Sequence, residues 1–254
     1  MHEKDEERRT AQEEVRTMAD GLRLETTGPT LTATIDAGEG NLFTREMMDD
    51  LVETVGDAGR TEEIRFVRLR AVGETFCMGR TKGGATPDEL RGMARRIGTV
   101  NEAFRTSPLT VIAEVNGSAA GFGVGMIGAS DIAVAAESAT FAFPEIRAGF
   151  APAVVISWAR FQLPQRLLYD MVSTGDAIDA ATALGAGLLT EVVEADGLAR
   201  RVDERIARLE AVDPFALREM KRFLIFTRAM DPGTAAQASV DTLVFSGLRV
   251  IGKF

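Results

Sequence analysis

The 254-residue sequence contains a single histidine, His2, and a single cysteine, Cys77. One thiol cannot form an intrachain disulfide or a CxxC zinc site. One imidazole, placed in a charged N-terminal stretch, excludes Ser-His-Asp hydrolysis, Cys-His catalysis and the common histidine metal sites. Proton transfer must therefore use carboxylates, the only tyrosine (Tyr169), lysines, the backbone or water. We expect no metal site.

Long apolar runs and an excess of basic residues are also missing. No apolar run approaches the roughly 20 residues that a membrane-spanning helix needs, and residues 1–14 lack the apolar segment of a secretory leader. The net charge is −9 and the basic residues are scattered, which argues against a nucleic-acid surface. We therefore expect a soluble, cytoplasmic protein without nucleic-acid or membrane partners.

The chain is long enough for one α/β domain with a small appendage. Its character changes along the sequence: a charged extension at 1–20, mixed strands and helices at 21–195, and a helical region at 196–254. Apolar alternation and β-rich runs predict strands at 22–26, 30–35, 64–71, 109–115, 131–135, 140–143 and 191–193. Helical spacing predicts a helix carrying Met47, Leu51 and Val55, and further helices at 87–104, 121–129, 153–161, 165–173, 179–186, 197–210, 214–230 and 233–246.

The stretch from Val111 to Gly149 carries the most informative motifs. Gly123-Val-Gly-Met-Ile-Gly128 fits the GxGxxG of a dinucleotide-binding turn, with Glu137 or Glu145 as the ribose acid, although the following helix is short. Ser118 has neither a GxSxG context nor a histidine base, so we interpret it as a small turn residue. Glycines that expose backbone N–H groups, followed by a carboxylate among apolar residues, favour chemistry on a developing oxyanion.

Several motifs in the right order resemble one family. Ile112-Ala-Glu-Val-Asn-Gly-Ser-Ala-Ala-Gly-Phe-Gly123, with Asp131-Ile following, resembles the first signature of the crotonase (enoyl-CoA hydratase/isomerase) family. Phe141-Ala-Phe-Pro-Glu-Ile-Arg-Ala-Gly149 resembles the second signature, and Phe76-Cys-Met-Gly-Arg80 resembles a conserved loop of that family. Residues 173–193 are similar to a further run of family motifs, so the resemblance covers about residues 22–230.

The resemblance implies a spiral core of ββα turns and a helical C-terminal region that forms trimers, often paired as hexamers. The substrate would be an acyl-CoA thioester, with coenzyme A as part of the substrate and no separate cofactor. The backbone N–H groups of Arg80 and Phe122 would form the oxyanion hole. The residues assigned to substrate contact are Gly121, Gly123, Met78, Lys82 and Phe150.

One departure from the family concerns its two acidic positions. The second matches Glu145, whereas the first falls on Gly125, so one carboxylate is missing. A single base suits the removal and return of one proton, which favours isomerisation of a 3-enoyl to a 2-enoyl thioester. A hydratase, hydrolase or decarboxylase on the same scaffold, and a non-catalytic acyl-CoA-binding or assembly subunit, remain alternatives. We expect Phe141, Phe143 and Phe150 to bury Glu145 and raise its pKa.

Other residues receive weaker assignments. Glu114 and Asp131 are alternative acids, although we interpret both as structural, and Trp158 and Tyr169 are interpreted as core or oligomer contacts. The basic residues considered for the coenzyme A phosphates are Arg80, Lys82, Lys221, Arg222 and Lys253.

Overall fold

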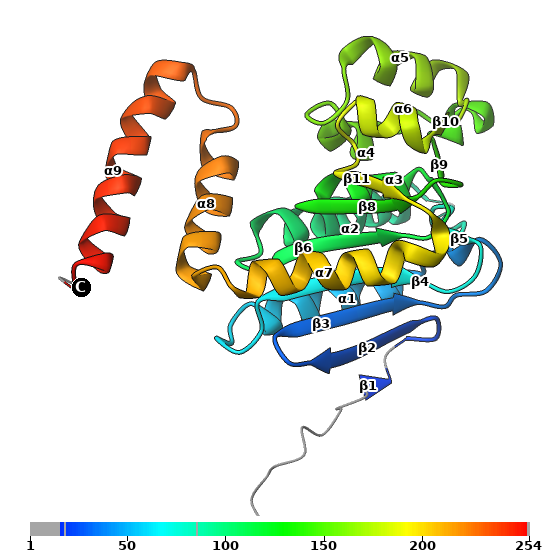
Figure 1. The fold of residues 1–254 in the computed structure, drawn as a ribbon. Helices are drawn as coiled ribbons and strands as arrows, with labels where there is room; N and C mark the ends of the chain where they lie inside the picture. The colour runs from blue at the N-terminus through cyan, green and yellow to red at the C-terminus, as the bar shows by residue number, and fades with distance from the viewer. Residues whose placement is uncertain (1–15, 18, 85, 253–254) are drawn as a thin grey trace, which may run out of the picture.

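The computed structural model describes residues 16–17, 19–84 and 86–252, and a seven-stranded sheet lies at its centre (Figure 1). The strand order is β1-β2-β3-β4-β6-β8-β11. From β3 to β11 all neighbours are parallel, and β1 and β2 add two antiparallel strands at one edge. The bounds are β1 Arg16–Thr17, β2 Leu22–Thr27, β3 Thr30–Ile35, β4 Phe66–Ala71, β6 Thr110–Val115, β8 Ile132–Ala136 and β11 Glu191–Val193.

A second sheet of four short strands accompanies the first, in the order β10-β9-β7-β5. Consecutive strands of the chain alternate between the sheets, so β4, β6 and β8 lie in the large sheet and β5, β7 and β9 in the small one. This alternation confirms the predicted ββα spiral. The bounds are β5 Thr75–Cys77, β7 Ser118–Ala120, β9 Thr140–Ala142 and β10 Ile178–Asp179.

The interpretation of Ser118 as a turn residue was wrong, because Ser118 begins β7. Its Oγ lies 2.9 Å from Thr140 Oγ1, and Thr140 begins the neighbouring strand β9. The hydroxyl therefore helps to hold two strands of the small sheet together.

Six helices pack around the two sheets and enclose the main core. The two longest of these helices begin with a side-chain cap: Thr44 Oγ1 accepts from Met47 N at 3.2 Å before α1, and Thr86 and Glu89 form a capping box at α2. The whole of α3 is buried, because aliphatic, aromatic and glycine residues occupy all of its faces. The bounds are α1 Arg45–Ala58, α2 Pro87–Thr106, α3 Phe122–Ala129, α4 Ala153–Ala159, α5 Gln165–Thr174 and α6 Ala180–Gly185.

Helix α7, Leu198–Glu210, lies along the other face of the large sheet (Figure 1). A second apolar cluster forms there from Phe66, Ile112, Val134, Leu198, Val202 and Ile206. Beside it, Arg68 Nε donates to Glu114 Oε2 at 2.6 Å and Arg68 Nη1 donates to Asp203 at 2.7 Å. The Glu114 carboxylate is therefore paired under α7, and α7 belongs to the packed body although the sequence places it in the C-terminal region.

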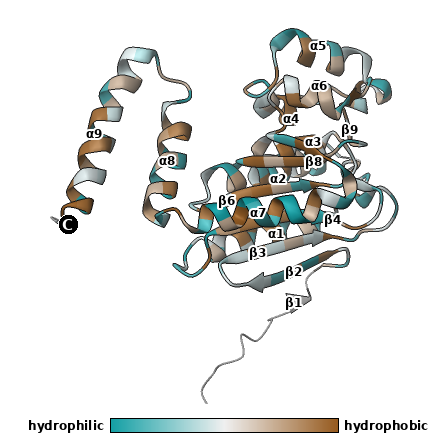
Figure 2. Ribbon diagram, viewed as in Figure 1, coloured by the Kyte–Doolittle hydropathy of each residue, from teal (hydrophilic) through white to brown (hydrophobic). Residues whose placement is uncertain are grey.

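The last two helices, α8 Pro214–Thr227 and α9 Pro232–Val250, form a hairpin that projects from this body (Figure 1). The rings of Phe215 and Phe245 lie 5.6 Å apart between the two helices. Hydrophobic segments are visible along both helices (Figure 2), and several of their large apolar side chains are exposed. Within the described ranges, no helix is both long and apolar enough to cross a membrane.

Lys221 fastens α8 to the body through an ammonium group that is almost fully enclosed. Its side chain is 9% exposed, and Nζ donates to Phe104 O at 2.9 Å, Leu109 O at 2.8 Å and Asp131 Oδ2 at 2.7 Å. Burial raises the pKa of Asp131 and lowers the pKa of Lys221, and their mutual attraction opposes both shifts. The assignment of Lys221 to coenzyme A phosphates is therefore wrong for this subunit, since its donors are already used.

We predict that Lys221→Met lowers the free energy of unfolding by about 3 kcal/mol, because it leaves Asp131 and two carbonyl groups without their buried partner. Urea denaturation at fixed protein concentration measures the change. The neighbouring Arg222→Met removes the same charge from an exposed side chain and should cost less than about 0.5 kcal/mol. Equal effects of the two substitutions would contradict this role of Lys221.

Candidate active site

The N-terminus of α3 begins at a glycine, whereas α1 and α2 begin at a threonine whose side chain caps the helix. Gly121 occupies the N-cap position with φ 51° and ψ −109°, a backbone conformation that L side chains rarely adopt, and its N–H donates to Ala142 O at 2.9 Å. The next residue, Phe122, begins the helix, where N–H groups have no intrahelical acceptor. In the described part of the chain, we find no acceptor for the Phe122 N–H.

Two close approaches bring three segments together at this helix start. A Cβ atom on Gly121 would stand 2.1 Å from Glu145 Oε1, and a Cβ atom on Gly123 would stand 2.1 Å from Cys77 O. Any side chain larger than hydrogen would clash at either position. The carboxyl end of β5, the start of α3 and the Glu145 carboxylate therefore surround one point.

Phe43 supports both backbone groups assigned to the oxyanion hole. It forms a parallel bridge with Arg80, in which Phe43 N donates to Gly79 O and Phe43 O accepts from Thr81 N. In this pairing the N–H of Arg80 itself is directed away from Phe43, and it has no acceptor among the described residues. The Phe43 ring meets the Phe122 ring edge to face at a centroid distance of 5.3 Å. The backbone of Phe43 is thus hydrogen-bonded on both sides of Arg80, and the Phe43 ring packs against Phe122.

Asn41, in the short 3₁₀ helix Glu39–Asn41, supports the same strand end and was missed as a functional residue. Its backbone has φ 48°, and its buried Nδ2 donates to Val72 O at 2.9 Å and Thr75 O at 2.8 Å. These bonds join the loop before α1 to the ends of β4 and β5. In the sequence, an asparagine just before a helix cap indicates only a turn. The role of Asn41 was missed because its hydrogen-bond partners lie more than 30 residues away in the chain.

Glu145 lies in the 3₁₀ helix Pro144–Ala148 that follows β9. Its Oε2 atom is buried and has no hydrogen-bond partner among the described residues. Burial raises the pKa of Glu145, while a backbone hydrogen bond and the positive charge of Arg80 oppose this shift. The carboxyl group is therefore a stronger base than an exposed glutamate, and one of its oxygens is available.

Gly125 lies four residues after Gly121. It occupies the first of the two acidic positions of the family, where the sequence has no carboxylate. A Cβ atom there would stand 3.0 Å from Val155 Cγ1 and 3.5 Å from Asn101 Nδ2. The side of α3 that faces α4 is thus closed by Val155, and the nearest polar side-chain atom to the missing Cβ belongs to Asn101. Glu145 is the carboxylate that the fold brings against the start of α3.

Comparison with known proteins agrees with this geometry. The family model described as enoyl-CoA hydratase/isomerase matches residues 32–248. The chain belongs to this family, the crotonases. A hexahydro-indene-carboxyl-CoA hydrolase of Mycobacterium tuberculosis is 36% identical over 205 residues, covering 76% of this chain and 79% of that protein. A cyclohexa-1,5-dienecarbonyl-CoA hydratase of Thauera aromatica is 31% identical over 196 residues, covering 74% of each chain.

A solved enoyl-CoA hydratase from Mycobacterium smegmatis has the same fold. Its TM-score is 0.86 at 23% identity, with 89% of this chain and 90% of that chain covered. At 23% identity, this similarity shows that the two proteins share a fold and does not show that they catalyse the same reaction.

The remaining substrate-contact residues of the crotonase prediction lie around the site with different exposure. Met78 and Lys82 flank Arg80, and both are exposed. Phe150 is 58% exposed, and its N–H donates to Glu145 O at 3.0 Å. Phe141 and Phe143 are fully buried, as expected. The Cys77 thiol is also buried, which raises its pKa to about 12 and disfavours the thiolate.

Several weaker predictions concern residues away from this site. Asp131 pairs with Lys221, which supports its structural interpretation, and Tyr169 is 72% exposed and so is not a core residue. Trp158 is partly buried beneath the Arg105 guanidinium, at 4.3 Å from its ring centroid. Lys253 lies outside the described residues. Where the structure is described, no three His, Cys, Asp or Glu residues group as metal ligands.

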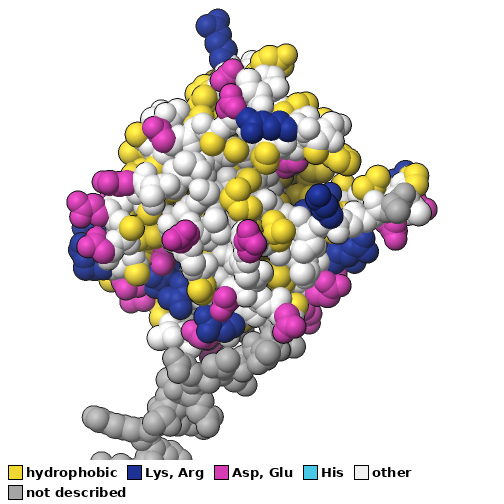
Figure 3. Space-filling view, turned by 90° about the vertical axis from the view of Figure 1, so that its right-hand side faces the viewer, with side chains coloured by type: hydrophobic (Ala, Val, Ile, Leu, Met, Phe, Trp, Pro, Cys, Tyr) yellow, Lys and Arg dark blue, Asp and Glu magenta, His cyan; other side chains and the backbone are white. Residues whose placement is uncertain are grey.

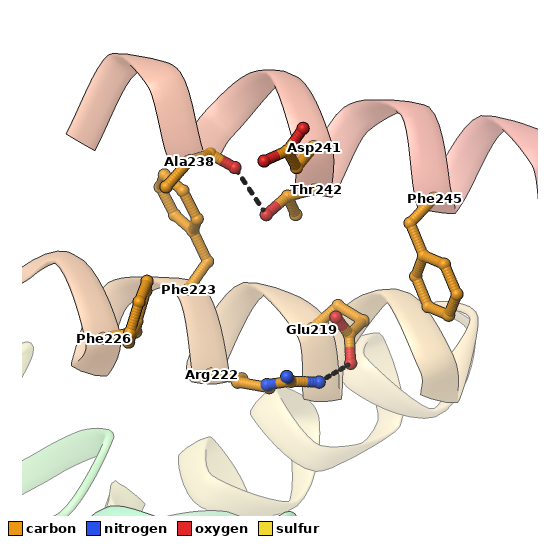
Figure 4. A pocket seen from close by; sticks show the side chains of 8 residues that line it. All are labelled: Glu219, Arg222, Phe223, Phe226, Ala238, Asp241, Thr242 and Phe245. Atoms are coloured by element: carbon orange, nitrogen blue, oxygen red, sulfur yellow. Dashed lines mark hydrogen bonds and ion pairs between the residues drawn. The ribbon is translucent and has the colours of Figure 1, made fainter. Parts of the chain in front are cut away.

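A groove of about 370 Å³ lies between α8 and α9 (Figure 4). Arg222 lines it beside Glu219, and Phe223, Phe226 and Phe245 contribute aromatic rings.

On the face shown in Figure 3, basic and acidic side chains are interspersed. This face of the chain therefore has no broad region of one charge for a polyanion.

We predict that Arg80→Met raises the pKa of Glu145 further, because it removes the positive charge that favours the carboxylate while keeping the backbone N–H. Side-chain carboxyl ¹³C NMR titration of the protein measures this pKa, with Glu145→Gln assigning the signal. Lys82→Met removes a nearby exposed charge and should leave the pKa unchanged. An unchanged or lower pKa in Arg80→Met would contradict the assigned effect of Arg80.

Proposed function

We propose that this crotonase acts on an acyl-CoA thioester through an enolate, and that its reaction is isomerisation of a 3-enoyl-CoA to a 2-enoyl-CoA. The observation that carries this proposal is Glu145, a buried carboxylate with a free Oε2 beside the start of α3 and without a second carboxylate at Gly125. One carboxylate is sufficient for a reaction that moves a proton from one carbon to another.

The proposed steps balance within the substrate. Glu145 Oε2 removes a proton from C2, and the electron pair spreads over the C3–C4 double bond and the thioester carbonyl. The N–H groups of Arg80 and Phe122 stabilise the negative oxygen, an effect worth about 3–4 kcal/mol for each donor. Glu145 then returns the proton to C4, which leaves the double bond between C2 and C3. Lys82, exposed beside Arg80, is the basic side chain that we assign to the coenzyme A phosphates.

A second candidate reaction is hydrolysis of a cyclic acyl-CoA. It is favoured by the 36% identity to a protein named as a hydrolase of an indene-carboxyl-CoA. The same oxyanion donors would stabilise the negative oxygen that forms when water attacks the thioester carbonyl, before coenzyme A leaves as the thiol. The two reactions use different substrates, so assays with each substrate distinguish between them.

We predict that the purified protein converts 3-hexenoyl-CoA to 2-hexenoyl-CoA and that Glu145→Gln lowers kcat by about 10²–10⁴-fold, since the amide cannot accept the proton. Absorbance of the conjugated thioester measures the rate. Because the base must be ionised, activity should fall as the pH falls through the raised pKa of Glu145, above the ordinary glutamate value of about 4.3.

Glu145→Asp is the matched control, since it keeps the carboxylate and should retain part of the activity. A wild-type protein that does not shift the double bond would refute the isomerase assignment. Turnover of a cyclic β-keto acyl-CoA in the same preparation would support hydrolysis instead. Equal rates for wild type and Glu145→Gln would remove Glu145 from the mechanism.

We also propose that α8 and α9 form the subunit contacts of a homotrimer. The hairpin projects from the body (Figure 2). Its exposed apolar residues include Leu224, Leu243 and Val250. Exposed apolar surface of this extent is typical of protein interfaces. Burial against neighbouring copies would give these side chains the apolar contacts that they lack in the single chain.

We predict that Leu243→Asp dissociates the assembly, because a charge placed at a packed apolar contact must be desolvated. Sedimentation equilibrium measures the mass of the particle. Leu184→Asp, at an exposed apolar residue of α6 outside the hairpin, is the control and should leave the mass unchanged. A monomeric wild-type protein would rule out the proposed trimer.

A further inference from the structure

A cavity of about 460 Å³ lies between α8 and the C-terminal end of α3. Its walls come from Arg105 near the end of α2, from Gly128 and Ala129 of α3, from the turn after α4 and from one side of α8. An eight-residue α-helix is about 12 Å long, so the length of α3 separates this cavity from the proposed oxyanion donor at its start. The cavity is therefore a second candidate site, apart from the one that contains Glu145.

Two arginines line the cavity, and the described residues do not fully satisfy either of them. The Arg105 side chain is 16% exposed, and its buried Nε has no hydrogen-bond partner among the described residues. Glu102 Oε2 lies 3.6 Å from this Nε, which is beyond hydrogen-bond distance. Arg228, just after α8, forms no ion pair with any described residue. Burial, together with the positive charge of Arg105, lowers the pKa of Arg228, so the two cations lie close enough to repel each other.

Aromatic rings hold both guanidinium groups in place. Arg105 Cζ lies 4.3 Å from the ring centroid of Trp158 in α4, and Arg228 Cζ lies 4.5 Å from the ring centroid of Phe161 in the turn that follows. A guanidinium group that stacks on a ring presents its flat face to that ring and keeps its N–H groups along its edges. These contacts therefore fix the two cations without using their N–H groups, which remain for a ligand.

The other charges at the cavity cancel. Lys221 Nζ donates to Asp131 Oδ2 at 2.7 Å, so of the three cations and one carboxylate that line the cavity, two positive charges are in excess. Ala129 and Ile225 supply apolar parts of the wall. The volume lies in the range of about 300–1,000 Å³ that is typical of pockets for small organic molecules. Charge and size together favour an organic anion with two negative charges.

We propose that this cavity binds a small organic dicarboxylate, with one carboxylate at Arg105 and the other at Arg228. A planar guanidinium group can donate two parallel N–H bonds to a carboxylate, which suits arginine to this ligand. Arg105 belongs to the body, whereas Arg228 ends the first helix of the hairpin. The bound anion joins α8 to α2 and relieves the repulsion between the two arginines. It uses neither Glu145 nor the acyl-CoA, so the proposal goes beyond the proposed function.

Isothermal titration calorimetry of the full chain with succinate, glutarate and adipate measures this binding, and the series covers different separations of the two carboxylates. The ionic strength is kept low, because salt screens exposed charges. We expect one dicarboxylate to bind per chain and the melting temperature to rise with its concentration, since the ligand binds the folded state. Acetate, which carries a single carboxylate, should bind about tenfold or more weakly.

Arg228→Met should weaken binding by about 10- to 100-fold, because it removes charge-assisted hydrogen bonds to one carboxylate. Arg228 is exposed, so we expect this variant to fold. Arg105→Met should have the same effect from the other side of the cavity. Arg222→Met is the matched control and should bind like the wild type, since it removes a positive charge from an exposed side chain of α8 outside this cavity.

The proposal is overturned if the wild-type protein binds none of the dicarboxylates, or if all three variants weaken binding equally, which indicates a general effect of charge. Binding of inorganic phosphate without binding of a dicarboxylate would overturn the assignment of an organic ligand. Displacement of the dicarboxylate by free coenzyme A would assign the cavity to the acyl-CoA substrate instead.

A neighbouring subunit could also supply the carboxylate. In that case the wild-type protein binds no dicarboxylate, and Arg228→Met lowers the mass of the particle in sedimentation equilibrium, which overturns the proposal. None of these measurements depends on the double-bond shift, so failure of this proposal and failure of the proposed function can be distinguished.

Discussion

The start of α3 lies so close to the backbone of β5 that Gly123 cannot carry a side chain, and Gly121, which lies against Glu145, has a φ of 51° that side chains disfavour. This steric constraint organises the active site. It allows the backbone of α3 to approach the carbonyl of Cys77 and the carboxylate of Glu145 within a distance that any Cβ atom would occupy. Arg80 follows β5 and Phe122 begins α3, so their N–H groups lie on the two segments that meet here. Phe43 contacts both residues. The small sheet makes this contact possible, because β5, β7 and β9 pair side by side and the three segments follow these strands.

Enclosed polar groups in this protein fall into two kinds. Some are paired and join elements of the fold: Arg68 with Glu114 beneath α7, and Lys221 with Asp131 beneath α8. Others, Glu145 Oε2 and the Asn101 amide, have no partner in the described chain and lie beside α3. Because an unpaired enclosed group is costly, the paired groups are best understood as architecture, whereas the unpaired Oε2 atom of Glu145 lies at the start of α3, where we propose that the substrate binds. Asp131 and Glu114 are thereby distinguished from Glu145 although all three are acidic.

The sequence predicts the longer elements well because their patterns are local. Met47, Leu51 and Val55 face the core from α1, and the apolar runs at 30–35 and 109–115 form β3 and β6. The short strands β5 and β7 were interpreted as a loop and a turn, since three residues are too few to display a period of two. Asn41 was not recognised as a residue that supports the site. Its hydrogen bonds depend on carbonyl groups of distant segments, and no local pattern encodes them.

The sequence by itself determined which chemistry is possible: without a histidine partner or a second cysteine, and with glycines before one apolar-flanked carboxylate, proton transfer at a stabilised oxyanion remained. The family resemblance also predicted Glu145, Arg80 and Phe122 as site residues. Only the tertiary structure decided how each group is used. Packing enclosed Lys221 in hydrogen bonds, left Phe150 exposed, and set Asn101 beside the carboxylate-free Gly125. Solvation and pairing control the reactivity of a side chain, and both arise from contacts between residues far apart in the sequence.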